Sequence, residues 1–317
     1  MKFELEKRTS RDIYGDLMLD LAREDEKVVG VTGDSQMMMR MTKMAKEFPN
    51  RVFNVGIAEQ NAMNMAAGMA ATGYKPFVAG FAPFMTMRAC EQLRTFICYP
   101  NLNVNVIGGM GGLSASTEGV THMGLEDIGI TRSFPNMIVT APADGESAYV
   151  IGRALYEHVG PTYMKIFKGS VYKVFDRNTY KFEIGKANLM REGTDVTIIA
   201  NGPMVALSLE ACDILAGQGV NARLLEMPCV KPIDREAIIA AAKETGLIVT
   251  AEDHQIYCGL GSAVTEVVCD EYPVRVVRMG VKDTFAESGD HYELLEKYGL
   301  GTDSIVKTVL DAVQNKK

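Results

Sequence analysis

The sequence is organised around one stretch, Val52-Phe53-Asn54-Val55-Gly56-Ile57-Ala58-Glu59-Gln60-Asn61. It begins with residues typical of a strand, turns at Gly56, and continues into a predicted helix over residues 58–73 that is rich in Ala, Gly and Met. Glu59 then lies in the first helical turn, at the carboxyl edge of a predicted parallel sheet, where open α/β folds build their sites. We therefore expect its carboxylate to point into a seam between packed helices, and not into solvent.

Glu59 also has a simpler interpretation. An acidic residue in a first helical turn stabilises the helix dipole by less than about 1 kcal/mol, and many surface glutamates do only that. The isolated stretch favours this interpretation. The rest of the chain favours a site, because it supplies a glycine-rich loop and a histidine at the same predicted sheet edge.

Composition excludes several classes of protein. The chain has 317 residues, enough for two domains, with 47% hydrophobic and 23% charged residues, as is ordinary for a globular protein. Its formal net charge of −7 argues against a nucleic-acid binder. The N-terminus is too charged for a signal peptide, and no apolar run reaches membrane-spanning length, so we expect a cytoplasmic protein with no membrane contact.

Sulfur-containing residues are interpreted as packing. The six Cys form no C-x-x-C pair and have no His at metal-ligand spacing, so we expect buried thiols, a reducing compartment and no metal ligands in this chain. Among the twenty Met, five crowd one short segment, and we expect them in the core or at a subunit interface: Met37, Met38, Met39, Met41 and Met44.

The hydrophobic pattern predicts two doubly wound α/β domains with mostly parallel sheets. We assign residues 1–170 to the first domain, 171–190 to a linker and 191–317 to the second domain. In the first domain Ser10 is expected to cap the first helix, and residues 84–97 are expected to form a later one. The predicted strands cover residues 28–31, 52–55, 76–79, 103–107, 137–140, 163–167, 196–199, 222–225, 247–250 and 274–277.

A long glycine-rich loop follows the predicted strand at 103–107 and runs from Gly108 to His122. It is no phosphate-binding P-loop, since no G-K-[ST] follows, and no helix starts directly after its glycines as a dinucleotide-binding motif requires. A lone His is more often structural than catalytic. His122 shares the predicted sheet edge with Glu59, and this favours a site.

Other glycines and histidines have weaker interpretations. Cys258-Gly259-Leu260-Gly261-Ser262 precedes a helix and is either an anion site or, as we prefer, a close helix–sheet contact. His254 has no partner that the sequence identifies. His158 and His291 are expected at the surface.

At this point the chain resembles the transketolase family. Gly56 to Asn61 matches the signature of that family's aminopyrimidine-binding domain, and Glu118-Gly119-Val120-Thr121-His122 resembles its D-G-x-T-H loop. Leu125 to Ile128 and Pro135 to Asp144 continue the match, which runs on into the second domain. A family domain with a G-D-G…N metal motif is missing, so the chain resembles the C-terminal subunit of a split, two-chain transketolase.

The resemblance implies a thiamine-diphosphate-dependent enzyme that transfers a two-carbon ketol unit from a ketose to an aldose, pentose phosphates included. A separate N-terminal subunit would hold the diphosphate and its Mg²⁺ (or Ca²⁺), and two copies of each chain would form a heterotetramer. The helix after Glu59 is our candidate for its central contact. The chain alone is expected to be inactive.

The resemblance also gives Glu59 a role. A carboxyl group bonded to the pyrimidine nitrogen N1′ shares a proton with it and favours the imino tautomer of the 4′-amino group, which can then remove the proton from C2. We expect burial to raise the pKa of such a carboxyl. Phe81 and Phe84 lie where the family packs aromatics against this ring, with Ile57 beside them, although ordinary core packing explains Phe84 equally well.

The expected substrate residues depart from the family pattern. His122 would contact the donor's hydroxyls, and Glu118 replaces the family's Asp. Where the family holds a sugar phosphate with His, Ser and Arg, this chain has Met110, Met38 and Lys168. Two polar contacts become apolar, and Lys lacks the bidentate fork of Arg. We therefore expect a substrate whose tail is not an ordinary terminal phosphate.

Three alternatives remain open. A 1-deoxyxylulose-5-phosphate synthase shares the region of Thr121 to Gly124 but normally carries all its domains on one chain. A 2-oxo-acid dehydrogenase beta subunit lacks the G-I-A-E-Q signature, and a pyruvate decarboxylation assay would separate both from ketol transfer. A non-catalytic regulatory paralogue has no evident reason to keep Glu59 and His122.

Overall fold

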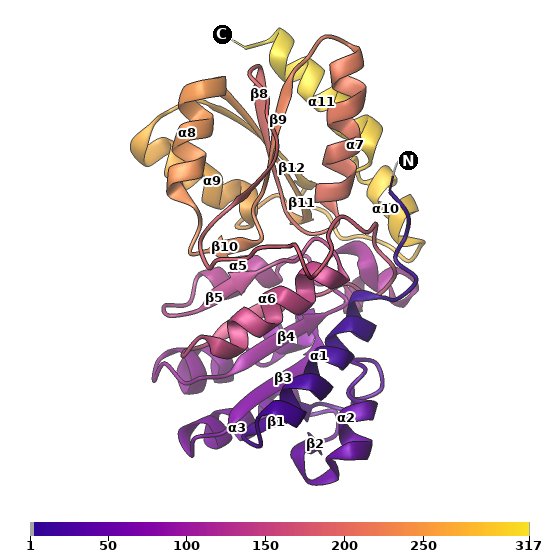
Figure 1. The fold of residues 1–317 in the computed structure, drawn as a ribbon, viewed down its shortest axis with the longest axis vertical. Helices are drawn as coiled ribbons and strands as arrows, with labels where there is room; N and C mark the ends of the chain where they lie inside the picture. Colours follow the sequence, from indigo (N-terminus) through magenta and orange to yellow (C-terminus); the bar gives the residue numbers. More distant parts are fainter. Residues whose placement is uncertain (1–2, 317) are drawn as a thin grey trace.

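The computed structural model describes residues 3–316 as two α/β domains, stacked along the long axis of the molecule (Figure 1). The first domain is built on a seven-stranded sheet in which all neighbouring strands are parallel except one edge pair, β10 with β5. In spatial order its strands are β10 (Cys229–Lys231), β5 (Ile138–Thr140), β6 (Thr162–Lys165), β4 (Asn105–Gly109), β3 (Lys75–Phe81), β1 (Val28–Thr32) and β2 (Val52–Asn54).

Helices cover both faces of this sheet, as buried parallel strands require. Successive residues of β3 point to opposite faces: Phe77 and Ala79 pack with one set of helices, and Val78 packs with the other. The first set is α1 (Ser10–Glu24), α2 (Thr42–Glu47) and α6 (Gly145–Glu157). The second set is α3 (Glu59–Ala71), the segments η2 (Phe84–Arg88), α4 (Cys90–Gln92) and η3 (Leu93–Cys98), and α5 (Asp127–Arg132).

The second domain repeats this architecture on a smaller sheet. Its strand order is β12 (Arg275–Val281), β11 (Leu247–Gln255), β8 (Val196–Ala200), β9 (Ala222–Glu226) and β7 (Asn188–Arg191), with only β7 antiparallel. One face carries α7 (Met204–Gly217), α10 (His291–Lys297) and α11 (Thr302–Gln314), and the other carries α8 (Arg235–Thr245) and α9 (Leu260–Glu271). The predicted fold class is confirmed.

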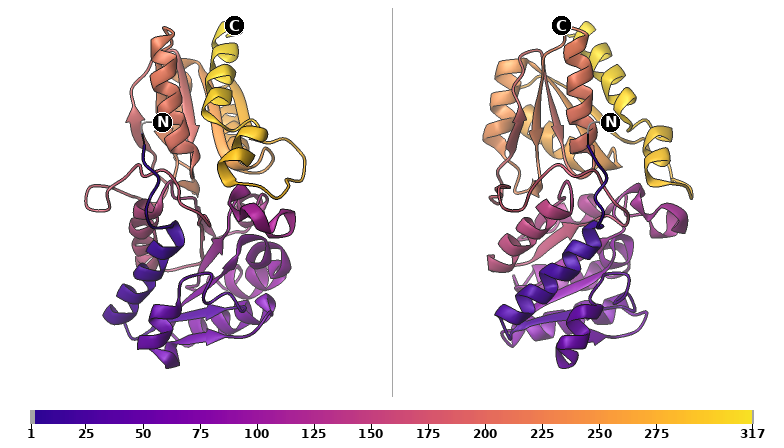
Figure 2. Two further views of the ribbon diagram at one scale, coloured as in Figure 1. Left: turned by 90° about the vertical axis from the view of Figure 1, so that its right-hand side faces the viewer. Right: turned by 45° about the vertical axis from the view of Figure 1, so that its right-hand side comes forward.

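The chain passes between the two domains more than once. Strand β10 comes from the second half of the sequence, yet it pairs with β5 in the first sheet. Strand β7 begins inside residues 171–190, the range expected to form a linker. The segment before α1 lies beside the connection between the domains, where Leu5 bridges Tyr172, and it can be followed in both views of Figure 2. Local patterns do not reveal such pairings, because each strand's partner is distant in sequence.

Two local predictions need correction. Thr9, not Ser10, caps α1: its side chain accepts from the backbone N–H of Asp12, and the Asp12 side chain accepts from Thr9 in return. The predicted helix over 84–97 contains two π-helical segments, η2 and η3. A π-turn adds one residue per turn and shifts every later side chain around the axis, and such turns are frequent at functional sites.

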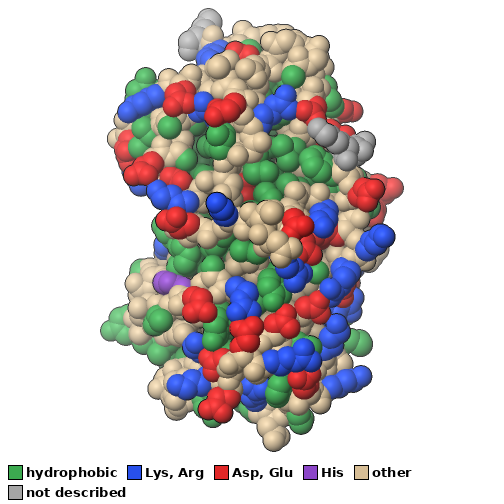
Figure 3. Space-filling view, viewed as in Figure 1, with side chains coloured by type: hydrophobic (Ala, Val, Ile, Leu, Met, Phe, Trp, Pro, Cys, Tyr) green, Lys and Arg blue, Asp and Glu red, His purple; other side chains and the backbone are tan. Residues whose placement is uncertain are grey.

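The methionine and cysteine predictions hold in part. Met39, Met41 and Met44 lie in the core, whereas Met37 is exposed. All six cysteines are free thiols, but Cys258 and Cys269 are exposed, so the expectation of buried thiols is wrong for these two. On the face shown in Figure 3, acidic and basic side chains are interspersed over the first domain. Within residues 3–316 no helix combines the length and apolar character needed to cross a membrane.

Candidate functional site

Glu59 begins α3 and is buried, with 2% of its surface exposed. The turn before it depends on Gly56, whose φ of +76° is strained for other residues. Gly33, just after β1, allows the close approach of the Glu59 side chain, because a Cβ at Gly33 would lie only 3.3 Å from Glu59 Cγ. The predicted burial of Glu59 at the sheet edge is confirmed.

The partner of Glu59 is Arg88, which sequence reasoning missed. Arg88 Nη1 donates to Glu59 Oε2 at 2.8 Å, and the guanidinium also lies over the ring of Phe84, with Cζ 4.1 Å from the ring centroid. The π-turn of η2 starts at Phe84 and ends at Arg88, and the N–H of Ala89 donates back to the carbonyl of Phe84. No spacing rule links Arg88 to Glu59, since 29 residues separate them.

Three rings complete this cluster. Phe81 and Phe84 lie 5.4 Å apart between centroids, and the His122 ring stands edge-on to both, at 5.0 Å from Phe81 and 5.1 Å from Phe84. His122 ends η5 (Val120–His122), and its Nδ1 lies 2.8 Å from Thr121 Oγ1. The structure thus brings together four residues that the sequence singled out separately. Ile57, the fifth, lies at the turn before α3 and is 78% exposed.

The glycine-rich loop is held from the second domain. Its turn passes through Met110 with φ +59°, a conformation that costs a non-glycine residue energy and tends to occur at functional sites. Asp253 at the end of β11 accepts from the N–H of Leu113 at 2.9 Å, and its other oxygen lies 3.1 Å from His291 Nε2. His291 is therefore buried against Asp253, and the expected surface position is wrong.

The predicted substrate residues differ in burial, since Met110 is fully buried and Lys168 and Glu118 are partly exposed. Met110 is fully buried in a core cluster, against which Met38 and Phe81 also pack, so the Met110 side chain has no surface to offer a substrate. Lys168 forms an ion pair with Glu118 and also donates to the carbonyl of Ala115 at 3.3 Å. Burial opposes the effect, but the Lys168 ammonium holds the pKa of Glu118 below its ordinary value.

The ion-pair residue Lys168 has one further anchor, Arg11 of α1. Arg11 is buried, and its Nε donates to the carbonyl of Lys168 at 3.0 Å. Its Nη1 donates to the carbonyl of Met38 at 3.0 Å. Arg11 therefore fixes the backbone at two of the three residues predicted to bind the substrate's tail, Met38 and Lys168. We call these residues, together with Met110, the tail site. The sequence did not single it out, because its bonds are to backbone atoms.

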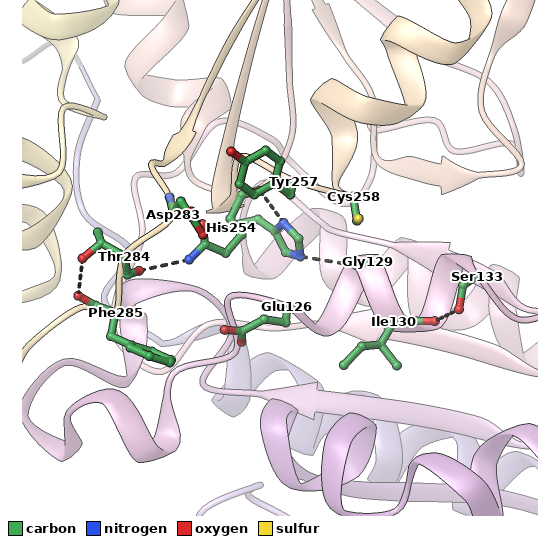
Figure 4. A pocket seen from close by; sticks show the side chains of 11 residues that line it. Glu126, Gly129, Ile130, Ser133, His254, Tyr257, Cys258, Asp283, Thr284 and Phe285 are labelled. Atoms are coloured by element: carbon green, nitrogen blue, oxygen red, sulfur yellow. Dashed lines mark hydrogen bonds between the residues drawn. The ribbon is translucent and has the colours of Figure 1, made fainter.

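His254 has a structural position between the domains. Its Nδ1 lies 2.7 Å from the carbonyl of Gln255, and its Nε2 accepts from the N–H of Gly129 in α5 at 3.3 Å. Burial lowers the pKa of His254 to about 4, with the nearby Lys165 charge adding to the effect. His254 lines a cavity of about 570 Å³ between α5 and the segments after β11 and β12, which contains none of the residues around Glu59 (Figure 4).

The glycine segment before α9 is occupied by the chain itself. Glu252 accepts from the N–H groups of Leu260 at 2.7 Å and Gly261 at 2.8 Å. The helix N-terminus therefore binds an anion, as one interpretation expects, but that anion is an internal carboxylate. Burial raises the pKa of Glu252 to about 7. Among the described residues, no three His, Cys, Asp or Glu side chains are grouped to hold a metal ion.

Comparison with known proteins agrees with this geometry. Residues 6–172 match the transketolase pyrimidine binding domain, and residues 185–305 match the transketolase C-terminal domain. The chain therefore belongs to the transketolase family. It is the pyrimidine-binding and C-terminal subunit of a split, thiamine-diphosphate-dependent transketolase.

Relatives of similar length support the split arrangement. The chain is 38% identical over 99% of its length to 97% of the 6-deoxy-6-sulfo-D-fructose transketolase subunit SqwH of Clostridium sp. (strain MSTE9). It is 38% identical over 96% of its length to 97% of one subunit of the apulose-4-phosphate transketolase of Phocaeicola vulgatus. A solved split-gene transketolase, described as an inactive beta4 tetramer, superposes with a TM-score of 0.89 at 41% identity, covering 98% of this chain and 99% of that one.

The 1-deoxyxylulose-5-phosphate synthases are larger proteins. That of Heliobacterium modesticaldum is 38% identical over 94% of this chain, but only 46% of its own length is covered. The two relatives named above, each covered over 97% of its length, are transketolase subunits, and this favours ketol transfer over the synthase alternative.

Proposed function

We propose that Glu59, Phe81 and Phe84 form a slot that binds the aminopyrimidine ring of thiamine diphosphate. Ile57 would lie at the edge of this slot. The observation that carries this proposal is the position of Arg88, a flat group that donates a hydrogen bond to the buried Glu59 carboxyl while lying over Phe84. The space between Glu59 and Phe84 therefore accommodates a planar group that donates a hydrogen bond to the Glu59 carboxyl. The aminopyrimidine is such a group when its N1′ shares a proton with the carboxyl.

In this proposal each of the site residues of this chain has its own role. When bound, thiamine diphosphate supplies the nucleophilic carbon that carries the two-carbon ketol unit. Glu59 holds a proton at N1′ and takes it back, as a positioned acid and base. Phe84 and Phe81 fix the plane of the ring and exclude water from it. His122 stands edge-on to both rings, and this supports a role for it in bonding a hydroxyl of the donor.

A partner subunit completes the site in this proposal. It carries the G-D-G…N motif, holds the diphosphate and Mg²⁺ (or Ca²⁺), and assembles with this chain as a cytoplasmic heterotetramer with two copies of each. The inner face of α3 packs on its own domain through Ala62, Met63 and Ala66, so a central contact there would use the exposed Gln60, Asn61 and Asn64. The related beta4 tetramer described as inactive supports the expectation that this chain alone does not catalyse.

The proposed donor is a ketose whose tail is not an ordinary terminal phosphate. Lys168 is the one cation among the predicted tail residues, and its charge is already paired with Glu118. Apolar Met38 lies on the other side of the Arg11 anchor. A phosphate dianion is stabilised best by several cations, whereas a singly charged sulfonate needs fewer. One relative is named as a 6-deoxy-6-sulfo-D-fructose transketolase subunit, and this supports a donor with a sulfonate tail.

Steady-state kinetics of the reconstituted pair tests this function. We expect no ketol transfer by this chain alone, and transfer from a sulfonated ketose with a higher kcat/KM than from fructose 6-phosphate or xylulose 5-phosphate. Activity of the single polypeptide would contradict the split site. A preference for standard sugar phosphates over all modified analogues would contradict the tail assignment, and pyruvate decarboxylation without ketol transfer would contradict both.

A further inference from the structure

We infer that Arg88 competes with the aminopyrimidine ring for Glu59 and Phe84, so that thiamine diphosphate binds only when the guanidinium leaves both side chains. This inference rests on the proposed function, since it concerns the same slot. It adds a residue that neither the sequence signature nor the catalytic roles include, and it assigns that residue an effect on cofactor affinity.

The competition follows from the two contacts that Arg88 makes. Its Nη1 donates to Glu59 Oε2 at 2.8 Å, and its Cζ lies 4.1 Å from the centroid of Phe84. A cation over an aromatic face at this distance fills the stacking position. A pyrimidine that stacked on this face of Phe84 and bonded Glu59 would need the volume that the guanidinium fills, so the two groups exclude each other there.

The exposures of the two partners show which side chain moves. The Glu59 side chain is 3% exposed, whereas the Arg88 side chain is 45% exposed. Glu59 is held by packing against the end of β1, where Gly33 leaves it little space. Arg88 lies at the last position of η2 with solvent on one side, so it can rotate outward while the backbone stays in place.

The arrangement also explains how a buried carboxylate is tolerated before the cofactor arrives. An uncompensated charge at 2% exposure is costly, and Arg88 supplies both a counter-charge and a hydrogen bond. Because its partner is half-exposed, the pair is weak enough to be exchanged. Arg88 therefore keeps the slot formed at a small cost in cofactor affinity.

The experiment measures thiamine diphosphate affinity by calorimetry in the reconstituted pair, with Mg²⁺ present and no sugar. We expect Arg88→Met to bind the cofactor about two- to fivefold more tightly than wild type, which corresponds to roughly 0.4–1 kcal/mol. Arg94→Met, which removes an exposed charge from the neighbouring segment η3, should leave the affinity unchanged. Inorganic pyrophosphate, which has no pyrimidine ring, should bind wild type and Arg88→Met equally.

Two further results decide the matter if Arg88→Met fails to assemble. Arg88→Lys keeps the charge but loses the planar stack, and we expect it also to bind more tightly than wild type. A structure of the wild-type pair with thiamine diphosphate should show Arg88 turned away from Glu59. Equal or weaker cofactor binding in the variants, or an Arg88–Glu59 bond that persists beside the bound cofactor, would overturn the inference. Failure of the wild-type pair to bind thiamine diphosphate at all would instead overturn the proposed function.

Discussion

Buried charged side chains occur in two regions at the carboxyl edge of the first sheet, around Glu59 and around Lys165. Lys165 is 1% exposed, and its ammonium donates to Asp127 Oδ1 at 3.2 Å and to the carbonyls of Gly124 at 3.2 Å and Asp253 at 2.8 Å. Tyr163 donates to the other oxygen of Asp127 at 2.6 Å. Glu59, equally buried, depends instead on one half-exposed arginine.

This difference separates a structural cluster from a candidate site. Around Lys165 every donor of the ammonium is used, and the bonds join β6, α5 and the end of β11, so the cluster holds the two domains together. Around Glu59 the one side-chain partner found among residues 3–316 is Arg88, which we expect a ligand to replace. Burial alone therefore does not distinguish a functional charged group from a structural one. The distinction depends on whether its hydrogen-bond partners can be replaced by a ligand.

Replacing Lys165, the cation of the structural cluster, should have the largest effect on stability. Lys165→Met leaves Asp127 buried without its counter-charge, and we expect the free energy of unfolding to fall by about 3–5 kcal/mol. Urea unfolding measures this. Lys186→Met provides the matched control, because Lys186 pairs with Glu236 at 2.8 Å at the surface and should change stability by less than ~1 kcal/mol. Equal effects of the two variants would remove the proposed distinction.

Changing Glu59 should affect catalysis and not folding. We expect Glu59→Gln to lower kcat of the reconstituted pair at least ~100-fold, because an amide cannot exchange a proton with the pyrimidine nitrogen. Glu91→Gln, at an exposed acid in α4, is the control and should be close to wild type. A loss of only a few-fold in folded Glu59→Gln would return Glu59 to a helix-dipole role.

Lys168 tests whether the tail site recognises an anion. We expect Lys168→Met to raise KM for a donor with an anionic tail about tenfold, with kcat little changed, because a charge-assisted bond in the ground state is lost. The expected change is moderate, since Lys168 must first leave Glu118. Lys173→Met removes an exposed charge nearby as a control. An equal rise in KM for an uncharged donor would show that Lys168 positions the loop and does not bind the tail.

Glu226 is a third buried carboxyl, and the side chains that donate hydrogen bonds to it are neutral. Tyr180 and Asn188 donate to it, and burial raises its pKa to about 8. The folded state therefore binds a proton more tightly than the unfolded state, and the stability that this provides is present below about pH 4.5 and is lost as the pH rises through 8. Glu226→Gln should make the decline of the unfolding free energy with pH less steep, by roughly 1 kcal/mol per pH unit.

Thermal or urea unfolding between pH 5 and 8.5 checks this prediction. Glu6, with a pKa raised to about 8 mainly by burial and by Asp144, contributes a decline of the same sign. The difference between wild type and Glu226→Gln therefore isolates one group, whereas the wild-type profile alone does not. A difference that is constant across this pH range would contradict the assignment.

Much of the architecture could be predicted from local pattern. The apolar run at residues 28–31 predicts a buried strand, and the structure has the fully buried β1 (Val28–Thr32) there. The alternation of such runs with helices identifies the fold class. The placement of Glu59 in the first turn of α3 followed from Gly56 and the helix after it. The π-turns of η2 and the antiparallel strand β10 were missed, because neither leaves a periodic signal in sequence.

The sequence by itself determined the two α/β domains, the family, and the presence of Glu59, His122 and the phenylalanines at one sheet edge, since residue spacing and motif are properties of the chain alone. Only the tertiary structure decided the partners: Arg88 on Glu59 across 29 positions and Asp253 on the glycine-rich loop across 140. Such contacts depend on how separate elements pack and on which side chains the packing leaves mobile. Those are distances in space, which sequence separation does not encode.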